Sequence, residues 1–199
     1  MASTTNRARD VIFVIGAPGA GKGTLCKRLA EDNNLEHLSI GDLLRQISSS
    51  PNADQIMASY IQRGELLPTD MILSILGPFF QESSGQTLLL DGFPRQLDQA
   101  KEFESRFGPP NLVLFFDCPE DIARERVITR VAGRAGDTLE VFQKRYREFG
   151  ELNPPIMSYY REAIVTDTTG STEESYRVLQ SALDGSMEWL DVILKSVWS

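Results

Sequence analysis

The chain has 199 residues, of which 41% are hydrophobic and 24% are charged. This length and composition fit one folded domain with a substantial core and exclude wholesale disorder. Its 20 basic and 28 acidic residues give a net charge of −8, which argues against a nucleic-acid-binding protein. A polyphosphate-binding protein with this charge must gather its arginines locally.

The cysteines and the apolar runs indicate the compartment. Cys26 and Cys118 have no neighbour at metal-ligand spacing and fit a reducing environment. No apolar run reaches membrane-spanning length, and the polar first ten residues do not resemble a signal peptide. We therefore expect a cytoplasmic protein, with the nucleus as the second choice, that contacts no membrane.

A phosphate-binding loop follows the first expected strand. Residues 11–15 are apolar and predict a buried strand, and GAPGAGKGT at residues 16–24 (the phosphate loop) leads into a helix. Glycines let backbone N–H groups turn towards an anion, and the helix dipole adds to the attraction. Lys22 supplies a mobile charge for the outer phosphates. Because Gly23 precedes Thr24, the general pattern does not by itself assign a metal to the Thr24 hydroxyl.

The next segments predict a short strand at His37 and Leu38 followed by helices. Ser39 with Asp42 predicts a capping box at the start of the first helix. Its expected buried face is Leu43, Leu44 and Ile47. Further helices are expected at about residues 53–63 and after the turn at 66–70. We interpret His37 as a packing or hydrogen-bonding residue and not as a general base.

Two further apolar runs end in carboxylates. Residues 87–90 predict a buried parallel strand that ends at Asp91, and residues 112–117 repeat the pattern. The carboxyl ends of such strands are where open α/β sheets place ligand chemistry. Pro119 is expected in the first turn of the next helix.

The arginines gather between residues 126 and 147. Five of them lie on two expected helices and on the glycine-containing loop between these helices: Arg126, Arg130, Arg134, Arg145 and Arg147. The second of these helices is expected to begin with Asp137 and Glu140 as its cap. A solvated, salt-bridged helix pair is one interpretation, and a closing lid over a ligand is the other.

The last part of the chain predicts a strand at residues 164–166 and a helix capped by Ser171 and Glu174. After an interruption at residues 184–185, a final helix carries an apolar stripe that we expect to pack on the core: Trp189, Leu190, Ile193 and Val197. Strands that alternate with helices throughout predict an α/β fold with a doubly wound parallel sheet of about five strands.

Five ordered motifs resemble those of the nucleoside monophosphate kinases, the family of adenylate and UMP/CMP kinases. They are GAPGAGKGT, HLSIGDLLR (37–45), GELLP (64–68), DGFPRQLDQ (91–99) and LFFDCPEDI (114–122). The resemblance runs from Val11 to about Leu183. It implies one three-layer P-loop kinase domain over residues 1–199, with a helical NMP-binding insert at about 39–68 and a short lid at about 131–138.

The resemblance also implies site residues. The catalytic residues would be Lys22, Arg95, Arg134 and Arg145. ATP would bind to Gly19, Ala20, Gly21, Lys22, Gly23, Thr24, Arg126 and Arg130. The acceptor monophosphate would bind to Ile40, Arg45, Leu67, Gly92, Arg95, Gln99, Arg134 and Arg145. Asp91 would orient Mg²⁺ through its waters, and no zinc is expected because the lid has no cysteines.

The sequence departs from the family pattern in the lid, which is two residues short and has Gly136 in place of an aspartate. The acceptor base stays open, since Gln99 matches a glutamine that reads adenine, whereas Ile40 and Asp98 resemble the UMP/CMP branch. We favour a monomeric enzyme that transfers phosphate from ATP to UMP or CMP, with AMP as a second acceptor. The alternatives are an adenylate kinase, a nucleotide-binding paralogue without turnover and a kinase for another metabolite.

Overall fold

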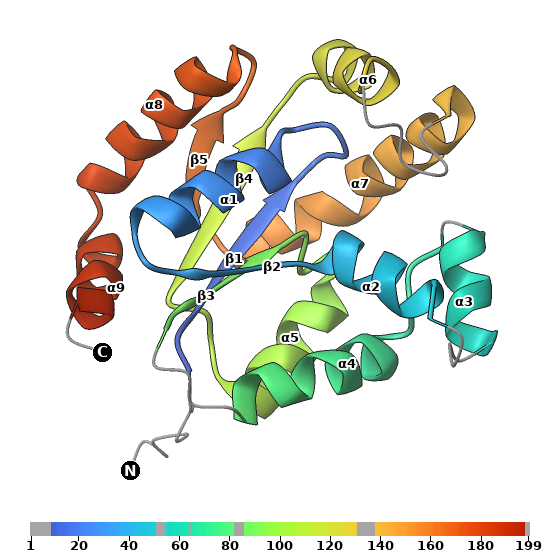
Figure 1. The fold of residues 1–199 in the computed structure, drawn as a ribbon, viewed down its shortest axis with the longest axis horizontal. Coiled ribbons are helices and arrows are strands. Elements are labelled where there is room, and N and C mark those ends of the chain that lie inside the picture. Colours follow the sequence, from blue (N-terminus) through green and yellow to red (C-terminus); the bar gives the residue numbers. More distant parts are fainter. Residues whose placement is uncertain (1–8, 51–54, 64, 82–85, 131–137, 198–199) are drawn as a thin grey trace.

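The computed structural model describes residues 9–50, 55–63, 65–81, 86–130 and 138–197. Its strands form one parallel sheet in the order β2-β3-β1-β4-β5 (Figure 1). Their bounds are β1 (Val11–Gly16), β2 (Glu36–Ser39), β3 (Leu88–Asp91), β4 (Leu112–Asp117) and β5 (Ile164–Asp167). The predicted α/β fold with a five-stranded parallel sheet is confirmed. The chain winds outward in both directions from β1, and this reversal is where such sheets bind ligands.

Helices cover both faces of the sheet and also extend beyond it. The described helices are α1 (Lys22–Asp32), α2 (Ile40–Ser48), α3 (Gln55–Gln62), α4 (Thr69–Gln81), α5 (Leu97–Phe107), α6 (Glu120–Ile128), α7 (Leu139–Tyr159), α8 (Thr172–Asp184) and α9 (Met187–Val197). Helices α1, α8 and α9 pack on one face, and α4 and α5 pack on the other (Figure 1). None of these described helices is both long and apolar enough to cross a membrane.

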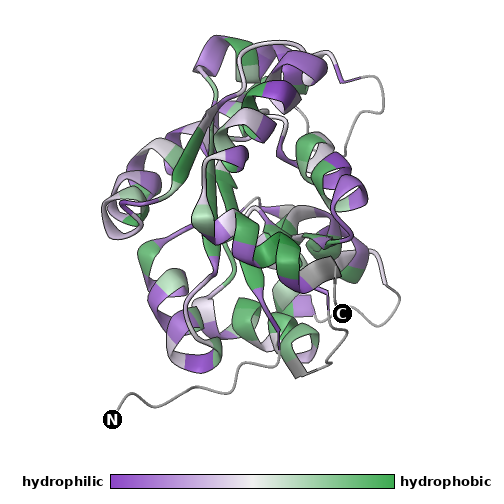
Figure 2. Cartoon of the chain, turned by 90° about the vertical axis from the view of Figure 1, so that its left-hand side faces the viewer, coloured by the Kyte–Doolittle hydropathy of each residue, from purple (hydrophilic) through white to green (hydrophobic). Residues whose placement is uncertain are grey.

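The sequence of strand β1 is apolar throughout because the strand is buried on both faces of the sheet. Ile12 and Val14 pack into the core beneath α1 and α8, whereas Phe13 and Ile15 pack into the core beneath α4 and α5. Successive side chains of a strand point to opposite faces, so both sets are buried. Figure 2 shows the resulting hydrophobic strands between helices of mixed hydropathy. Each such side chain contributes about 1.5–3 kcal/mol by burial.

The helix starts differ from the predictions at three places. Helix α7 is capped by Thr138, whose hydroxyl accepts from the Val141 N–H at 3.3 Å, so the predicted cap at residue 137 is wrong. Residue 137 itself lies outside the described residues. Pro119 is the N-cap of α6 and lies just before its first turn. At α2, Ser39 accepts from the Asp42 N–H at 3.4 Å, but the Asp42 carboxylate pairs with Arg45 and not with the cap.

The buried faces of α2 and α9 are narrower than predicted. Leu43, Leu44 and Ile47 are only half-buried, and Ile40 is the buried residue of α2, because this helix extends from the sheet edge towards α3 (Figure 1). On α9, Trp189 and Val192 are buried, whereas Leu190 is 45% exposed. The side chain of residue 197 is not among those described. The capping box predicted at the start of α8 is confirmed.

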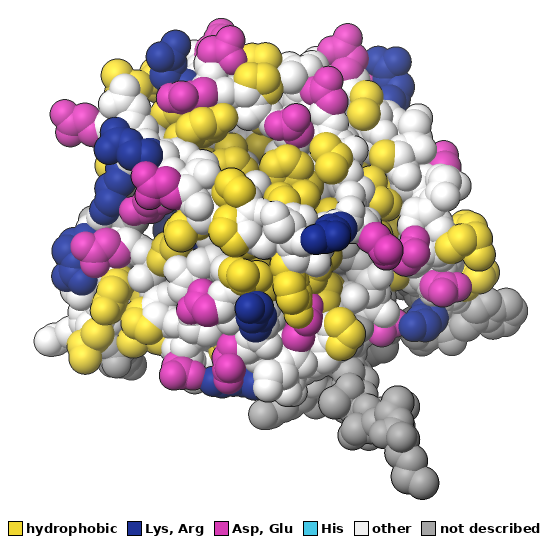
Figure 3. Space-filling model, turned by 180° about the vertical axis from the view of Figure 1, so that it is seen from behind, with side chains coloured by type: hydrophobic (Ala, Val, Ile, Leu, Met, Phe, Trp, Pro, Cys, Tyr) yellow, Lys and Arg dark blue, Asp and Glu magenta, His cyan; other side chains and the backbone are white. Residues whose placement is uncertain are grey.

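The surface seen from behind carries charges of both signs. In Figure 3, basic and acidic side chains lie interspersed around hydrophobic ones on this face. A nucleic-acid footprint would gather Lys and Arg on one face or along one helix. The pattern on this face therefore gives no support to such a function.

Candidate active site

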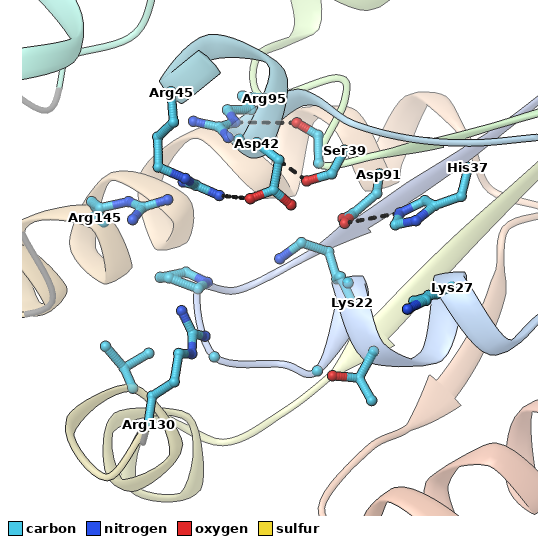
Figure 4. Close-up of a pocket in the computed structure, with 18 of the residues that line it drawn as sticks. Lys22, Lys27, His37, Ser39, Asp42, Arg45, Asp91, Arg95, Arg130 and Arg145 are labelled. Carbon is cyan, nitrogen blue, oxygen red and sulfur yellow. Dashed lines mark hydrogen bonds and ion pairs between the residues drawn. The ribbon is translucent and has the colours of Figure 1, made fainter. Parts of the chain in front are cut away.

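A cleft of about 700 Å³ opens at the carboxyl ends of β1 and β3, at the reversal of the sheet. The phosphate loop forms one wall, and α2 and the segment after β3 form the opposite wall (Figure 4). Besides His37, the ionisable side chains that line it are Lys22, Lys27, Arg28, Glu31, Asp42, Arg45, Asp91, Arg95, Arg130 and Arg145. The tertiary structure therefore brings cations from five separate parts of an acidic chain to one place.

The phosphate loop needs glycine at two positions. Gly19 has φ +89°, and a Cβ there would lie 2.2 Å from the Ala123 carbonyl oxygen of α6. Gly21 has φ +82° and is the N-cap of α1. This cap has no side-chain oxygen for the N–H groups of the first turn, an arrangement in which a bound anion can accept from them. The loop thus has the backbone conformation that phosphate binding requires.

Lys22 lies at the base of the cleft. Its Nζ donates to the carbonyl oxygens of Gly16 at 2.7 Å and Ala17 at 2.8 Å. Burial lowers the pKa of Lys22 to about 8; the nearby Asp91 carboxylate opposes this effect, and Arg95 and Arg145 add to it. The Asp91 carboxylate therefore does not offset the whole cost of burying the ammonium charge. Anionic phosphates would stabilise the charged form.

This pKa shift predicts a pH-dependent stability of the nucleotide-free protein. The pKa of Lys22 is about 8 when folded and near 10.5 when unfolded, so the unfolded state holds more protons between these values and stability rises with pH there. Relative to Lys22→Met, the parent should gain up to about 3 kcal/mol in the free energy of unfolding from pH 7.5 to 10.5. Urea titrations of both proteins across this range measure the difference. A difference that does not change with pH would contradict the shift.

Asp91 ends β3 and is 5% exposed. Its Oδ2 lies 3.5 Å from His37 Nε2 (Figure 4) and 3.6 Å from the place where a Cβ on Gly23 would stand. The missing side chain at position 23 leaves room beside this carboxylate. A hard oxygen donor at the cleft wall fits Mg²⁺ bound through water, because Mg²⁺ retains several of its waters in nucleotide sites. Thr24 is exposed in the same cleft.

Two arginines of the predicted acceptor site lie on the wall of the cleft opposite the phosphate loop (Figure 4). Arg45, on α2, pairs with Asp42 and is about one-third exposed. Arg95 donates from Nε to the Gly92 carbonyl at 3.1 Å. Burial and the neighbouring Arg145 lower the pKa of Arg95 to about 10, and Asp91 opposes this. Each guanidinium can bind a phosphate through two N–H groups.

The other predicted arginines are divided between the cleft and a second hollow beside it. Arg130 and Arg145 line the same cleft, from the end of α6 and from α7. Arg126 donates to the Thr169 carbonyl at 3.2 Å and to that of Gly170, in an adjoining hollow of about 350 Å³ that also contacts the phosphate loop. Arg134 and most of the predicted lid, residues 131–137, lie outside the described residues. The described part of the predicted ATP site is therefore continuous from the phosphate loop to the β5–α8 connection.

The predicted base contacts lie together in a small pocket beside the cleft. Ile40 and Leu67 are 2% and 4% exposed, and both line it with Gly92 and Gln99. Gln99 is 3% exposed, and its Oε1 accepts from the backbone N–H of Arg95 at 2.9 Å. Gln99 therefore holds the segment that carries Arg95, which leaves its NH₂ group as the donor for a base. The sequence assigned a base contact but not this positioning contact.

Two side-chain pairs lie in or near the site, and only one of them had a local sequence signal. Asp42 pairs with Arg45, and the i,i+3 spacing on a helix could have indicated that pair. Asp98 accepts from Thr69 at 2.6 Å and so joins the start of α4 to α5. Its carboxylate is used within the protein, and Asp98 does not line the base pocket. Thr69 is far away in sequence, so no spacing rule predicts this contact.

The fold and this cationic cleft define a P-loop nucleotide-binding protein. A sequence model of the family described as "Adenylate kinase" matches residues 14–165. The chain belongs to this family. It is 36% identical to uridylate kinase from Saccharomyces cerevisiae over 188 residues, which are 89% of this chain and 92% of the relative.

Two other relatives have different names. The chain is 37% identical to UMP-CMP kinase 2 from Oryza sativa subsp. japonica over 171 residues, covering 83% of this chain and 70% of the relative. It is also 37% identical to adenylate kinase 1 from Schistosoma mansoni over 172 residues, which are 82% of this chain and 87% of the relative. The comparisons therefore support the family resemblance seen in the motifs, while the names of the relatives divide over the acceptor base.

Proposed function

We propose that this protein is an ATP-dependent nucleoside monophosphate kinase that phosphorylates UMP and CMP to the diphosphates. The observation that carries the proposal is the cleft in which Lys22, Arg45 and Arg95 converge beside the phosphate loop and Asp91. The names of the relatives from yeast and rice support the pyrimidine acceptor. The partners would be nucleotides alone, and the enzyme would act as a cytoplasmic monomer.

Phosphoryl transfer requires positioning and charge stabilisation more than covalent chemistry from the protein. In the proposed mechanism Lys22 leaves the carbonyls of Gly16 and Ala17 and follows the charge of the migrating phosphoryl group. Arg95 and Arg45 hold the acceptor phosphate, and Arg45 exchanges Asp42 for it. Arg130, Arg134 and Arg145 would surround the transferring group, and Arg126 would contact the donor base. Cations gathered in this way would stabilise the charge that develops on the transferring group.

The residues present fit a magnesium-dependent reaction. Mg²⁺, when bound with ATP, neutralises charge on the donor phosphates. Asp91 would hold its waters, and the space above Gly23 would admit them. We further propose that residues 39–68 close over the monophosphate and that residues 131–138 act as the lid. Such closure excludes water from the reacting phosphates.

The proposal is tested by a coupled assay of ADP formation from ATP and Mg²⁺ with UMP, CMP, dCMP and AMP offered separately. UMP and CMP should give the highest kcat/KM. Binding of ATP without release of ADP from any acceptor would favour the paralogue without turnover. A strong preference for AMP would favour the second candidate, an adenylate kinase, which is supported by the buried Gln99 and by the relative from Schistosoma mansoni.

The base pocket yields a specificity prediction at Ile40. This side chain is buried at the start of α2 and adds bulk to the pocket without a hydrogen-bonding group. A missing partner for a buried polar edge costs about 1–3 kcal/mol. Ile40→Thr should therefore raise the kcat/KM ratio of AMP over UMP about tenfold or more. Steady-state assays with both acceptors measure this ratio, and an unchanged ratio would contradict the role of Ile40.

Gln99 should affect every acceptor in the same direction. Gln99→Ala removes both the base contact and the acceptor of the Arg95 N–H. We expect it to lower kcat/KM for UMP, CMP and AMP together, without changing ATP binding in their absence. A loss confined to one base would show that Gln99 reads the base but does not position Arg95.

A further inference from the structure

A thiol, an imidazole and a carboxylate meet beside the phosphate loop. Cys26 lies on α1, one turn beyond Lys22, His37 lies on β2, and Asp91 ends β3. One ligand atom from each of the three lies within 4.8 Å of the others. The local sequence gave no metal-ligand spacing for Cys26, because its neighbours come from two other elements that only the sheet brings together.

The side chain of His37 has a buried nitrogen atom that could bind a metal ion. Its Nε2 atom is buried and has no hydrogen-bond partner, although it lies 3.5 Å from Asp91 Oδ2 (Figure 4). An unsatisfied buried polar atom costs about 1–3 kcal/mol. A cation between the two side chains would accept the imidazole lone pair and neutralise the carboxylate in one step.

We propose that Cys26, His37 and Asp91 bind a borderline divalent cation, Zn²⁺ in particular, and that this occupancy inhibits phosphoryl transfer. Zn²⁺ takes Cys, His and Asp ligands at about 2.0–2.3 Å in a tetrahedral arrangement. The separation of 3.5 Å between His37 and Asp91 already suits such a geometry, and because all three ligand atoms lie within 4.8 Å of one another, a shift of no more than about 1 Å would complete it. The fourth position would face the cleft, which His37 and Asp91 both line.

Binding of the cation would release one proton from the Cys26 thiol. Burial raises the pKa of the Cys26 thiol well above its usual value, so the thiol is protonated in the metal-free protein. Formation of the sulfur–metal bond displaces this proton to solvent. His37 would bind as the neutral imidazole through Nε2, and Asp91 as the carboxylate.

Occupancy would inhibit because the site overlaps the reaction centre. Asp91 would be bound to the metal and no longer free to orient the waters of Mg²⁺. A doubly charged cation would also stand near Lys22, whose pKa already responds to both Asp91 and Cys26. The inhibitory half of the proposal rests on the proposed kinase function, whereas the binding half does not. This zinc differs from a structural zinc in the lid, which the sequence gave no reason to expect.

The binding half is tested with Co²⁺ as a spectroscopic substitute in the reduced, nucleotide-free protein. The parent should show a thiolate-to-cobalt charge-transfer band that saturates at one equivalent. Cys26→Ala should abolish the band. Cys118→Ala is the matched control, because Cys118 is also a buried free thiol and lies at the end of β4, and it should keep the band. No band in the parent, or a band that follows Cys118, would overturn the proposal.

His37→Gln provides a second test that does not depend on the thiol. It should lower the affinity for Co²⁺ at least tenfold while Cys26 stays in place, about the minimum expected for the loss of a direct ligand. This variant also keeps the proposal open to refutation if Cys26→Ala does not fold. Unchanged affinity in His37→Gln would overturn the three-residue site.

The inhibitory half is tested in the assay with Mg²⁺ and ATP. Micromolar Zn²⁺ should inhibit the parent and Cys118→Ala, and Cys26→Ala should resist it. Zinc binding without inhibition would overturn the inhibitory half alone. If no acceptor is phosphorylated at all, the proposed function fails, while the Co²⁺ spectra still decide the site.

Discussion

Lys22→Ala is expected to lower kcat by at least about a hundredfold, the scale of losing one preorganised electrostatic contact. The ammonium donates to the carbonyls of Gly16 and Ala17, next to the loop where we propose that the donor phosphates bind. Its lowered pKa shows that the site leaves this charge poorly stabilised until an anion binds. Pre-steady-state measurements of ADP formation would separate this effect on chemistry from effects on binding.

Lys101→Ala is a suitable control for this variant, because Lys101 is an exposed lysine on α5 outside the lining of the cleft. It should behave as the parent. Near-normal turnover in Lys22→Ala would remove Lys22 from the mechanism. A raised KM for ATP with an unchanged kcat would mean that Lys22 binds ATP equally in the ground state and the transition state.

Arg95→Ala is the second variant with a large expected effect. We expect kcat/KM for the monophosphate to fall by about 10²–10³-fold, since a bidentate cation at the reacting phosphate is lost. The backbone N–H of residue 95 would still donate to Gln99, so the base pocket should keep its geometry. ATP binding without an acceptor should change little, which isothermal titration calorimetry can measure.

Two further variants sharpen the test of Arg95. Arg95→Lys keeps the charge but loses the planar fork and should recover only part of the activity. Arg106→Ala is the matched control, because Arg106 lies at the far end of α5 and pairs with Glu102 and Asp70. Equal damage by Arg95→Ala to ATP binding and to acceptor use would mean that the acceptor site is placed wrongly.

Local sequence rules were sufficient for most of the fold. The apolar run of β1, the glycines at 19 and 21 and the capping box at Ser171 each state a local requirement of the backbone. Such requirements depend on neighbours in the chain, so they can be read without knowing the fold. The caps of α6 and α7 were displaced by one residue because several residues near a helix start can act as a cap, and the local geometry selects one.

The sequence by itself therefore determined the parallel α/β fold, the phosphate loop and the family. The tertiary structure decided which side chains from separate elements meet, such as Asp98 of α5 with Thr69 of α4. It also decided that Cys26 and His37 lie beside Asp91. Sheet register and helix packing set these encounters between residues that are distant in the chain. Periodicity and spacing describe one element at a time, so they carry no information about such encounters.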